Sequence, residues 1–537
     1  MNVSYGSIRL RELFEGKPTN SSQGLSGTDE SAVSALVFDT RELQPGCVFV
    51  ALRGTKHDGH DFLDEAVRKG AVALVIEDDS KLTDEIRQSY KGYIHVVAST
   101  RRELAFLAAR FFGSPSKELF TVGVTGTNGK TTTTNMIESV LNAGGNPTGV
   151  VGTIDHHLGS RVWPSDMTTP DPVRFQRRLR EFVDAGAKAV ALEVSSHALD
   201  QARVDAVNFD VAIFTNLTRD HLDYHGTMQA YSQAKFRFFA ELLPESEKCA
   251  SGPVTAVFNV DDPAGAEMAN RLERLVEAQR VRIWRCGSDD ECASRLDFSY
   301  RIESQGFDGV RFKLRTPRGE HAVFLAMPGK HNVQNVIGAF ATGEAIGMSS
   351  SAIVQAIQGI RGVPGRLERV PNRAGIHVFV DYAHTDDALK TILQLLQNVR
   401  AESETDAQAK IFTVFGCGGD RDRGKRPMMM KAALAGSDFV IATSDNPRTE
   451  DPEKILDDVM AGASSDDLVR VARIVDRRDA ISHALAKARR GDVVLIAGKG
   501  HEATQQIGTV KHPFSDVQVA SEALTALAKD LEKDPEE

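Results

Sequence analysis

The feature that most constrains the fold is the stretch FTVGVTGTNGKTTTTN, from Phe120 to Asn135. A buried strand is predicted before a glycine loop, and a helix is predicted after it. Backbone N–H groups of such a loop, with the N-terminus of the helix, can hold phosphate oxygens. Val124 stands where the common G-x-x-x-x-G-K-[ST] pattern has its first glycine, so this loop is shorter. The stretch predicts a nucleotide-phosphate site, with a plain glycine turn and a surface lysine as the alternative.

Two residues of the loop and one later carboxylate suit the chemistry of a nucleotide. Lys130 supplies a positive charge for the β- and γ-phosphates, and Thr131 supplies a hydroxyl suited to Mg²⁺. Glu193 ends another apolar run, and a carboxylate there could complete a Mg²⁺ site. These residues indicate nucleotide phosphates but do not say which reaction follows.

A second polar cluster leaves two interpretations open. The stretch NLTRDHLDYHG brings Asp220, His221, Asp223 and His225 together in a short loop. Such a cluster can bind a metal, or it can form a hydrogen-bonded turn. Lys235 follows on a predicted helix, where an isolated lysine is usually solvated.

The order of apolar runs predicts an α/β protein of three domains. Strand-like runs such as AKAVALEV, FDVAIFTNL and IFTVFGCGG alternate with helical stretches, which favours mostly parallel sheets. The runs VRIWRCG, DFSYRIES and GVRFKLRT are predicted to be antiparallel strands. We place the domains at residues 1–115, 116–362 and 363–537, with SPSKE as a linker at the first boundary.

Composition excludes several other classes of protein. The formal net charge of −10 argues against bulk binding of nucleic acid, which usually needs a basic face. Five cysteines without C-x-x-C spacing do not suggest a disulfide scaffold or a zinc site. The N-terminus lacks an apolar segment of signal-peptide length, and no long apolar run predicts membrane insertion. We therefore expect a cytoplasmic protein.

Six motifs occur in the order found in the Mur ligases, ATP-dependent amino-acid ligases of bacterial cell-wall synthesis. They are GTNGKTT, EVSSHALDQARV, FTNLTRDHLDYHG, MPGKHNVQNVIGA, GVPGRLERV and DYAHT. The chain resembles this family over nearly its whole length, and the shortened glycine loop is the family's form. The resemblance implies an N-terminal UDP-binding α/β domain, a central P-loop ATPase-like domain with a parallel sheet, and a C-terminal Rossmann-like α/β domain.

Within the family, SDNPRTEDP resembles the members that add meso-diaminopimelate. An arginine fork can bind the second carboxylate of diaminopimelate in two-pronged fashion, whereas lysine carries no group there. Lysine-adding relatives usually lack this arginine. By resemblance, Glu502 could take the distal ammonium. The residues implied around the amino acid are Arg421, Asp445, Asn446, Pro447, Arg448, Gly498 and Glu502.

The resemblance also implies the residues that hold ATP and metal. Thr131 and Glu193 would bind one Mg²⁺, while His221 would bind a second together with Lys235 as a carbamate formed from CO₂. Arg366 would reach the phosphates from the third domain and act with Lys130, His221 and Lys235 in catalysis. The ATP contacts implied are Gly126, Thr127, Asn128, Gly129, Lys130, Thr131, Thr132, Asn332 and Asn335 on the adenine side, and Asp381 at the ribose.

The first domain and part of the second are implied to bind the UDP-linked substrate. Thr40 stands where relatives often have serine and keeps a hydroxyl for the same hydrogen bond. The uridine site would consist of Phe38, Thr40, Thr55, Lys56 and His57. The site for the muramoyl-peptide would consist of Thr168, Thr169, Ser195, Gln201 and Arg203.

The implied reaction joins a carboxylate to an amine. ATP would phosphorylate the D-Glu γ-carboxyl of UDP-MurNAc-L-Ala-D-Glu, and the amine of meso-diaminopimelate would attack the acyl phosphate. Partners are thus small molecules, and we expect a monomer whose SPSKE and RGVPG segments act as hinges. Alternatives are a ligase that adds L-lysine or D-Ala-D-Ala, a folylpolyglutamate synthetase, and a P-loop ATPase without ligase activity.

Overall fold

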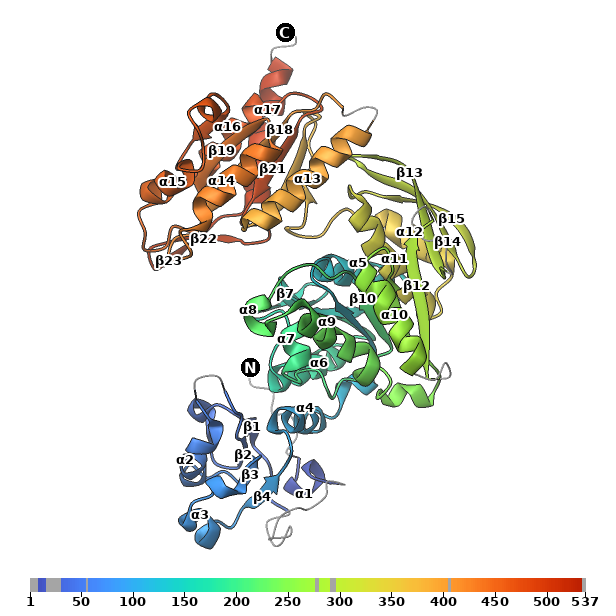
Figure 1. Cartoon of the computed structure of the whole chain (residues 1–537), viewed down its shortest axis with the longest axis vertical. Helices are drawn as coiled ribbons and strands as arrows, with labels where there is room; N and C mark the ends of the chain where they lie inside the picture. The colour runs from blue at the N-terminus through green and yellow to red at the C-terminus, as the bar shows by residue number, and fades with distance from the viewer. Residues whose placement is uncertain are drawn as a thin grey trace. The chain divides into compact units, whose positions relative to one another are not determined.

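The computed structural model describes residues 8–15, 30–54, 57–275, 280–289, 296–403 and 407–533. These residues form two compact units (Figure 1). The first unit holds the described residues up to Gly287 together with Ala341–Ser349, and the second holds Asp297–Phe340 and the described residues from Ser350 onward.

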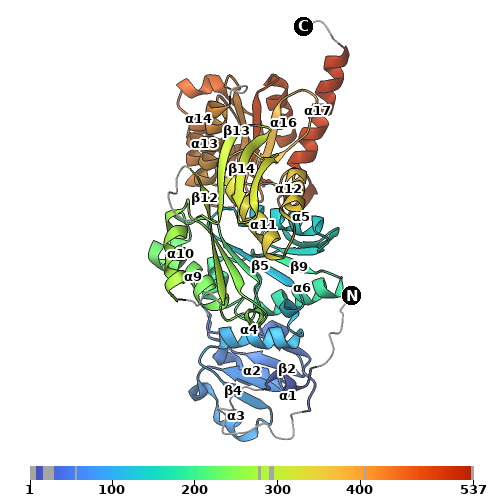
Figure 2. The same ribbon diagram turned by 90° about the vertical axis from the view of Figure 1, so that its right-hand side faces the viewer.

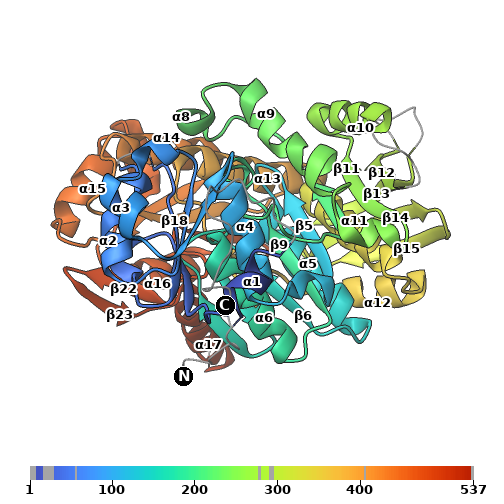
Figure 3. The same ribbon diagram turned by 90° about the horizontal axis from the view of Figure 1, so that it is seen from below.

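The first unit begins with a small parallel sheet whose strands are short apolar runs. The strand order is β1-β2-β3-β4, and every neighbouring pair is parallel. Helices α2 and α3 pack on one face, while α1 and α4 pack on the other (Figure 3). The elements are α1 (Leu10–Leu13), β1 (Ala35–Val37), β2 (Cys47–Val50), α2 (Leu63–Arg68), β3 (Ala73–Ile76), α3 (Asp84–Ser89), β4 (Tyr93–Val96) and α4 (Thr100–Phe111).

A larger sheet of the first unit carries the glycine loop. Its strands lie in the order β12-β11-β10-β5-β9-β6-β7-β8, parallel up to β6 and antiparallel in the hairpin of β7 and β8. The strands are β5 (Phe120–Thr125), β6 (Thr148–Val151), β7 (Asp155–Leu158), β8 (Arg161–Pro164), β9 (Ala189–Glu193), β10 (Val211–Phe214), β11 (Val254–Asn259) and β12 (Val281–Ser288). The helices are α5 (Lys130–Ala143), α6 (Pro172–Asp184), α7 (Ser196–Asp200), α8 (Leu222–His225), α9 (Met228–Arg237) and α10 (Pro263–Leu275).

One local expectation for this unit is wrong. The run VRIWRCG forms β12, which pairs in parallel with β11, because α10 connects the two strands as a crossover. The SPSKE segment, predicted to be a linker, contains the 3₁₀ turn Pro115–Lys117 and is tied to its surroundings. Ser116 Oγ accepts from the Asn208 amide at 3.1 Å, and Lys117 Nζ pairs with Glu247 at 2.7 Å. Residues on both sides of SPSKE belong to one compact unit, so the structure gives no support to a hinge there.

The second unit starts with an antiparallel meander. Strands β13 (Phe298–Gly306), β14 (Gly309–Thr316) and β15 (Gly319–Leu325) pair antiparallel, as DFSYRIES and GVRFKLRT predicted. Helix α12 (Ser350–Gly359) packs on β15, and α11 (Lys330–Ala345) begins in this unit. Figure 2 shows the long, curved strands of the meander.

The C-terminal part of the second unit is a doubly wound sheet. The strand order is β16-β17-β21-β18-β19-β20, and all pairs except that of β16 are parallel. Helices α13, α14 and α15 pack on one face, and α16 and α17 pack on the other. Its strands are β16 (Glu368–Arg369), β17 (His377–Asp381), β18 (Ile411–Cys417), β19 (Phe439–Ser444), β20 (Val471–Arg473) and β21 (Val493–Ala497). A separate antiparallel hairpin consists of β22 (Thr504–Ile507) and β23 (Val510–Pro513). The helices are α13 (Asp386–Glu402), α14 (Lys425–Gly436), α15 (Pro452–Met460), α16 (Arg477–Lys487) and α17 (Asp516–Lys533).

The predicted α/β class with parallel sheets is confirmed. Val, Ile and Leu dominate the strands of the doubly wound sheet, whose two faces are both buried under helices. In such sheets the loops at the carboxyl ends of the strands are the usual place for ligands. The residues predicted for phosphate and amino-acid binding lie in such loops, after β5, β18, β19 and β21.

Candidate active site

The glycine loop after β5 has a backbone that only glycine accommodates well. Gly126 has φ of 152°, and a Cβ there would lie 1.9 Å from Thr215 Oγ1. Gly129, with φ of 86°, caps α5. Thr215 Oγ1 donates to Asn128 O at 2.6 Å, which ties the loop to the end of β10. Lys130 Nζ donates to Gly126 O at 2.9 Å, so the loop holds the ammonium of its own lysine beside the N-terminus of α5.

Lys235 on α9 is brought directly to this loop. Its side chain is buried, Nζ donates to Gly126 O at 2.9 Å, and the Tyr231 ring lies 4.5 Å from Nζ. Burial, and then the positive charge of Lys130, lowers the pKa of Lys235 well below its ordinary value. The interpretation of Lys235 as a solvated lysine is therefore wrong. The amine is placed where its neutral form is favoured.

Two buried oxygen donors lie near the phosphate loop. Thr131 lies in the first turn of α5 and Glu193 ends β9, and β9 is the neighbour of β5. Glu193 Oε1 accepts from the Thr153 amide at 2.8 Å, and Glu193 Oε2 accepts from Thr153 Oγ1 at 3.0 Å. Thr169 Oγ1 donates to the Glu193 carbonyl at 2.7 Å. The donor set is oxygen-only, which suits a hard cation such as Mg²⁺.

The Asp and His cluster forms a turn with a packed aromatic group. His221 has φ of 52°, its amide donates to Asp220 Oδ1 at 2.8 Å, and α8 follows it. The His197 ring lies 4.9 Å from the His221 ring and 5.6 Å from that of His225. Within the described ranges, no three His, Cys, Asp or Glu side chains converge as a ready metal site. A metal here would therefore need ligands from outside this group.

A pocket of about 330 Å³ lies in the first unit. Phe38, Gln201 and Arg203, predicted for the UDP-linked substrate, all line it. Arg203 Nη2 donates to Gln201 Oε1 at 2.7 Å, and Arg203 Nη1 donates to Thr169 O at 2.7 Å. Its full lining is Phe38, Asp39, Arg41, Glu42, Leu52, Arg101, Leu104, Met167, Asp171, Pro172, Arg174, Gln201 and Arg203.

The other described residues predicted for this substrate are not part of the pocket lining. Thr40 lies in the 3₁₀ turn beside the pocket but is not part of its lining, and His57 is exposed. Thr168 Oγ1 lies 3.0 Å from Thr153 Oγ1, and Ser195 caps α7 by accepting from the Ala198 amide. Thr55 and Lys56 lie outside the described residues.

In the second unit, the residues predicted for ATP fall on separate elements. Asn332 and Asn335 are buried near the start of α11, where Asn332 Nδ2 donates to Pro328 O at 2.8 Å. Asp381 ends β17, and its two carboxylate oxygens accept from the Leu367 and Ala383 amides, both at 2.8 Å. The Arg366 guanidinium lies over the Tyr382 ring at 5.4 Å. Asp381 and Arg366 thus share one corner of the doubly wound sheet.

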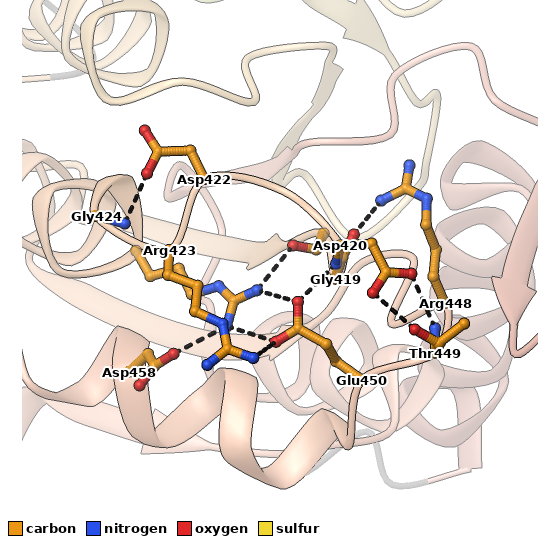
Figure 4. Close-up of polar contacts among 11 residues, drawn as sticks. Gly419, Asp420, Asp422, Arg423, Gly424, Arg448, Thr449, Glu450 and Asp458 are labelled. Carbon is orange, nitrogen blue, oxygen red and sulfur yellow. Dashed lines mark hydrogen bonds and ion pairs between the residues drawn. The ribbon is translucent and has the colours of Figure 1, made fainter.

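Arg448 sits where the loops after β18 and β19 meet (Figure 4). Its Nη1 donates to Gly419 O at 2.6 Å, and the Gly419 amide donates to Asn446 O at 2.9 Å. Asp420 Oδ1 accepts from Thr449 Oγ1 at 2.7 Å. These bonds fix the guanidinium of Arg448 against the glycine turn of the neighbouring loop.

Ion pairs centred on Glu450 stabilise the same two loops. Glu450 Oε1 accepts from the Asp420 amide at 2.6 Å and from Arg426 Nη2 at 2.8 Å. Arg423 Nη2 donates to Glu450 Oε2 at 3.0 Å, and Arg426 Nη1 donates to Asp458 at 2.9 Å (Figure 4). The Arg426 hydrogen bonds hold the pKa of Glu450 at about 2.

Asn446 and Glu502 come together from loops that follow different strands. Asn446 Nδ2 donates to Glu502 Oε2 at 3.0 Å. Burial would raise the pKa of Glu502, but the Asn446 hydrogen bond and the Lys499 charge lower it below its ordinary value. Asp445 lies beside them, and burial raises its pKa. Gly498 has φ of 119° close to Asp445, whereas Arg421 is exposed.

Sequence reasoning missed several charged residues of these sites. Arg41, Arg101 and Arg174 line the pocket of the first unit, yet each looked like an ordinary surface arginine in the sequence. Lys499 is buried in the loop after β21 and was not singled out. The signal available for Lys499 was its place between two glycines after an apolar strand, AGKG.

Comparisons with known proteins agree with this architecture. Residues 124–343 match the Mur ligase middle domain, residues 365–500 match the Mur ligase, glutamate ligase domain, and residues 32–112 match the Mur ligase family, catalytic domain. The UDP-N-acetylmuramoyl-L-alanyl-D-glutamate–2,6-diaminopimelate ligase of Geobacter metallireducens is 42% identical, over 97% of this chain and 99% of the relative. A ligase of the same name from Geobacillus thermodenitrificans is 41% identical, over 92% of this chain and 95% of the relative.

Solved structures give the same result. A structure of a ligase with that name aligns with a TM-score of 0.70 and 32% identity, over 97% of this chain and 100% of that chain. The folylpolyglutamate synthase of Thermotoga maritima, at 18% identity and a TM-score of 0.56 over 74% of this chain, shares the fold alone. The chain belongs to the Mur ligase family, as the six motifs predicted. Within the described part of the chain, no helix has the length and apolar character needed to cross a bilayer.

Proposed function

We propose that this chain is an ATP-dependent, ADP-forming ligase of peptidoglycan biosynthesis. It adds meso-2,6-diaminopimelate to the D-Glu γ-carboxylate of UDP-MurNAc-L-Ala-D-Glu through an acyl phosphate. Relatives that carry this activity in their names, at 41–42% identity over nearly the full chain, support the proposal. The structural observation that supports it is the hydrogen bond from Asn446 Nδ2 to Glu502 Oε2 at 3.0 Å, at the carboxyl edge of the doubly wound sheet where Arg448 also lies.

Each predicted domain receives one substrate in this proposal. Residues 1–115 bind the UDP end of the precursor, residues 116–362 bind ATP, and residues 363–537 bind the amino acid. The pocket of about 330 Å³ supports the first assignment, because its lining combines arginines with apolar side chains. Arginines suit the anionic groups of a UDP-linked peptide.

ATP is held by the glycine loop in this proposal. Lys130 neutralises charge on the transferred phosphoryl group, and Arg366 contributes a second positive charge. Thr131 and Glu193 would hold Mg²⁺, and their buried oxygens fit that ion. The ion would supply Lewis-acid stabilisation of the charge that develops on phosphate oxygens.

The role proposed for Lys235 is that of a carbamate. Addition of CO₂ to a neutral amine forms one N–C bond and releases one proton, so the product is an anion. The burial of Lys235 and the neighbouring positive charge of Lys130 favour the neutral amine that this addition needs. The anion would lie beside the glycine loop and could act with His221 toward a second Mg²⁺.

The amino-acid site orients the attacking amine. Arg448 presents a fork for the distal carboxylate of diaminopimelate, and Glu502 presents a carboxylate for the distal ammonium. Holding the far end of the molecule places the other amine for attack on the acyl carbon, and phosphate leaves. Fixed geometry of this kind accelerates a reaction between two bound groups.

The remaining parts of the proposal concern location and partners. Because ATP and UDP-linked precursors are made in the cytoplasm, we place the enzyme there. Its partners are small molecules, and we expect it to act as a monomer without nucleic acid.

Phosphate release tests the proposal directly. Purified protein is mixed with ATP, Mg²⁺ and UDP-MurNAc-L-Ala-D-Glu, and meso-diaminopimelate and L-lysine are added in parallel reactions. Release only with diaminopimelate is expected. Release with lysine would keep the ligase and remove the role of Arg448, and release that ignores both amino acids would point to an ATPase without ligase activity.

A further inference from the structure

Lys499 is a buried charged residue to which the proposed mechanism gives no role. It lies in the loop after β21, and its side chain is 0% exposed. Its Nζ donates to Asn446 Oδ1 at 3.1 Å and to Glu502 Oε2 at 3.0 Å, and it lies 4.0 Å from Asp445 Oδ1. Fully buried lysines are rare in proteins and are normally paired.

The contacts of Lys499 form a closed triangle with two residues proposed to bind the amino acid. Asn446 Nδ2 donates to the same Glu502 Oε2 that accepts from Lys499. Asn446 Oδ1 also accepts from the Gln506 amide at 2.9 Å, so the orientation of its amide is set on both sides. Both hydrogen bonds end on Glu502 Oε2, and among the described residues none ends on Glu502 Oε1. The Oε1 atom can therefore accept a hydrogen bond from a ligand.

The charge of Lys499 also bears on which amino acid fits. Lys499 already pairs with Glu502, the carboxylate proposed for the distal ammonium, at 3.0 Å. Diaminopimelate carries both a carboxylate and an ammonium at that end, whereas L-lysine carries only an ammonium. Because Lys499 already neutralises part of the Glu502 charge, Glu502 holds the ammonium of either amino acid less tightly, and only diaminopimelate has a distal carboxylate that Arg448 can bind in addition.

We propose that Lys499 is a positioning and specificity residue for the amino-acid substrate. Its ammonium fixes the Asn446 amide and the Glu502 carboxylate, and its charge selects diaminopimelate over lysine. The inference rests on the proposed function, which the wild-type reaction tests separately. If the wild type uses neither amino acid, the proposed function fails. If the wild type works and the Lys499 variants behave like it, only this inference fails.

The test compares two variants with a matched control. Lys499→Met removes the charge and the hydrogen bonds, and Lys499→Gln removes the charge but retains an N–H donor. Lys454→Met changes an exposed lysine of α15 and serves as the control. Steady-state KM values are measured for diaminopimelate, ATP and the UDP-linked precursor, together with kcat/KM for diaminopimelate and for L-lysine.

In the Met variant the KM for diaminopimelate should rise about 10- to 100-fold, as expected for loss of charge-assisted hydrogen bonds. The KM values for ATP and the precursor should stay within about threefold of the wild type. In both Lys499 variants the preference for diaminopimelate over lysine should fall about tenfold, which a merely structural role would not produce. The control should change none of these values.

Two results would overturn the inference. One is a KM for diaminopimelate and a preference over lysine that both stay within about threefold of the wild type in the Lys499 variants. The other is an equal rise of all three KM values, which would indicate general damage. Circular dichroism and thermal melting report folding. If only the Gln variant folds, its preference ratio decides, and failure of both to fold would assign Lys499 to stability alone and reject the specificity role.

Discussion

His157 should stabilise the hairpin of β7 and β8 at neutral pH and lose this effect in alkaline solution. Its Nδ1 lies 2.6 Å from Asp155 Oδ1, and its Nε2 lies 3.1 Å from Glu138 Oε2. Burial would lower its pKa, but the two carboxylates raise the pKa of His157 from 6.5 to about 9. Because the folded pKa exceeds the unfolded one, the stabilisation is complete below about pH 6.5 and is lost as the pH rises through about 9.

The size of the effect follows from the two pKa values. A pKa raised from 6.5 to about 9 corresponds to about 3 kcal/mol of unfolding free energy, at roughly 1.4 kcal/mol per pH unit. The His157 side chain is 17% exposed, so solvent screens the pair only partly. The difference in unfolding free energy between the wild type and His157→Gln should therefore shrink by about 3 kcal/mol between pH 6 and pH 10.

Tryptophan fluorescence can report this change locally. The chain has two tryptophans, and Trp163 lies on β8 directly opposite His156. In a Trp284→Phe background, urea unfolding followed by Trp163 fluorescence reports on the hairpin. His512→Gln, an exposed histidine of β23, is the control. A difference between the wild type and His157→Gln that is the same at pH 6 and pH 10 would refute the reasoning.

Three further substitutions have expected outcomes. Gly126→Ala places a Cβ 1.9 Å from Thr215 Oγ1 at φ of 152°, so ATP-dependent phosphate release should fall roughly 100-fold or more while circular dichroism shows a folded protein. Arg448→Lys should raise the KM for diaminopimelate roughly 30-fold without changing the KM for ATP, because an ammonium cannot make a two-pronged contact. Arg477→Met leaves Asp516 buried and unpaired, and urea unfolding should show a loss of about 3–5 kcal/mol, which Asp516→Leu in the same chain should largely restore.

The sequence predicts well those elements that are specified by residues close together in the chain. The apolar runs before Gly126 and after Thr132 define the strand, loop and helix of the phosphate site, because each element is specified by its own residues. The parallel class of the sheets followed from the alternation of strands and helices. The direction of β12 could not be predicted in this way. A strand that follows a crossover helix and a strand that follows a hairpin turn have similar apolar runs.

Contacts between distant loops could not be predicted from spacing. Lys499 meets Asn446 because the strands β21 and β19 both flank β18, and strand order is a property of the whole sheet. Arg477 donates to the Ala497 carbonyl at 3.0 Å and pairs with Asp516 Oδ2 at 2.7 Å, which ties the end of β21 to α17. The hairpin of β7 and β8 was also missed, because its strands are polar and short.

Strained backbone gathers beside the proposed catalytic and binding residues. His221, Asp420 and Arg448 have φ of 52°, 54° and 51°, and Ala202 and Leu367, with φ of 56° and 46°, adjoin the predicted site residues Gln201, Arg203 and Arg366. A left-handed conformation costs roughly 1–2 kcal/mol at a residue with a side chain. Such residues persist only where the surroundings enforce the conformation, and they concentrate at functional sites.

Arg448 shows how backbone hydrogen bonds impose a left-handed conformation. Its amide donates to Gln506 O at 3.1 Å, and its carbonyl accepts from the Gly508 amide at 2.7 Å, so the hairpin of β22 and β23 holds its backbone from both sides. The DNPR sequence does not predict the left-handed backbone conformation of Arg448. That conformation comes from pairing with β22, which lies later in the chain. The direction of the Arg448 guanidinium therefore depends on three loops together, and the DNPR signature marks only one of them.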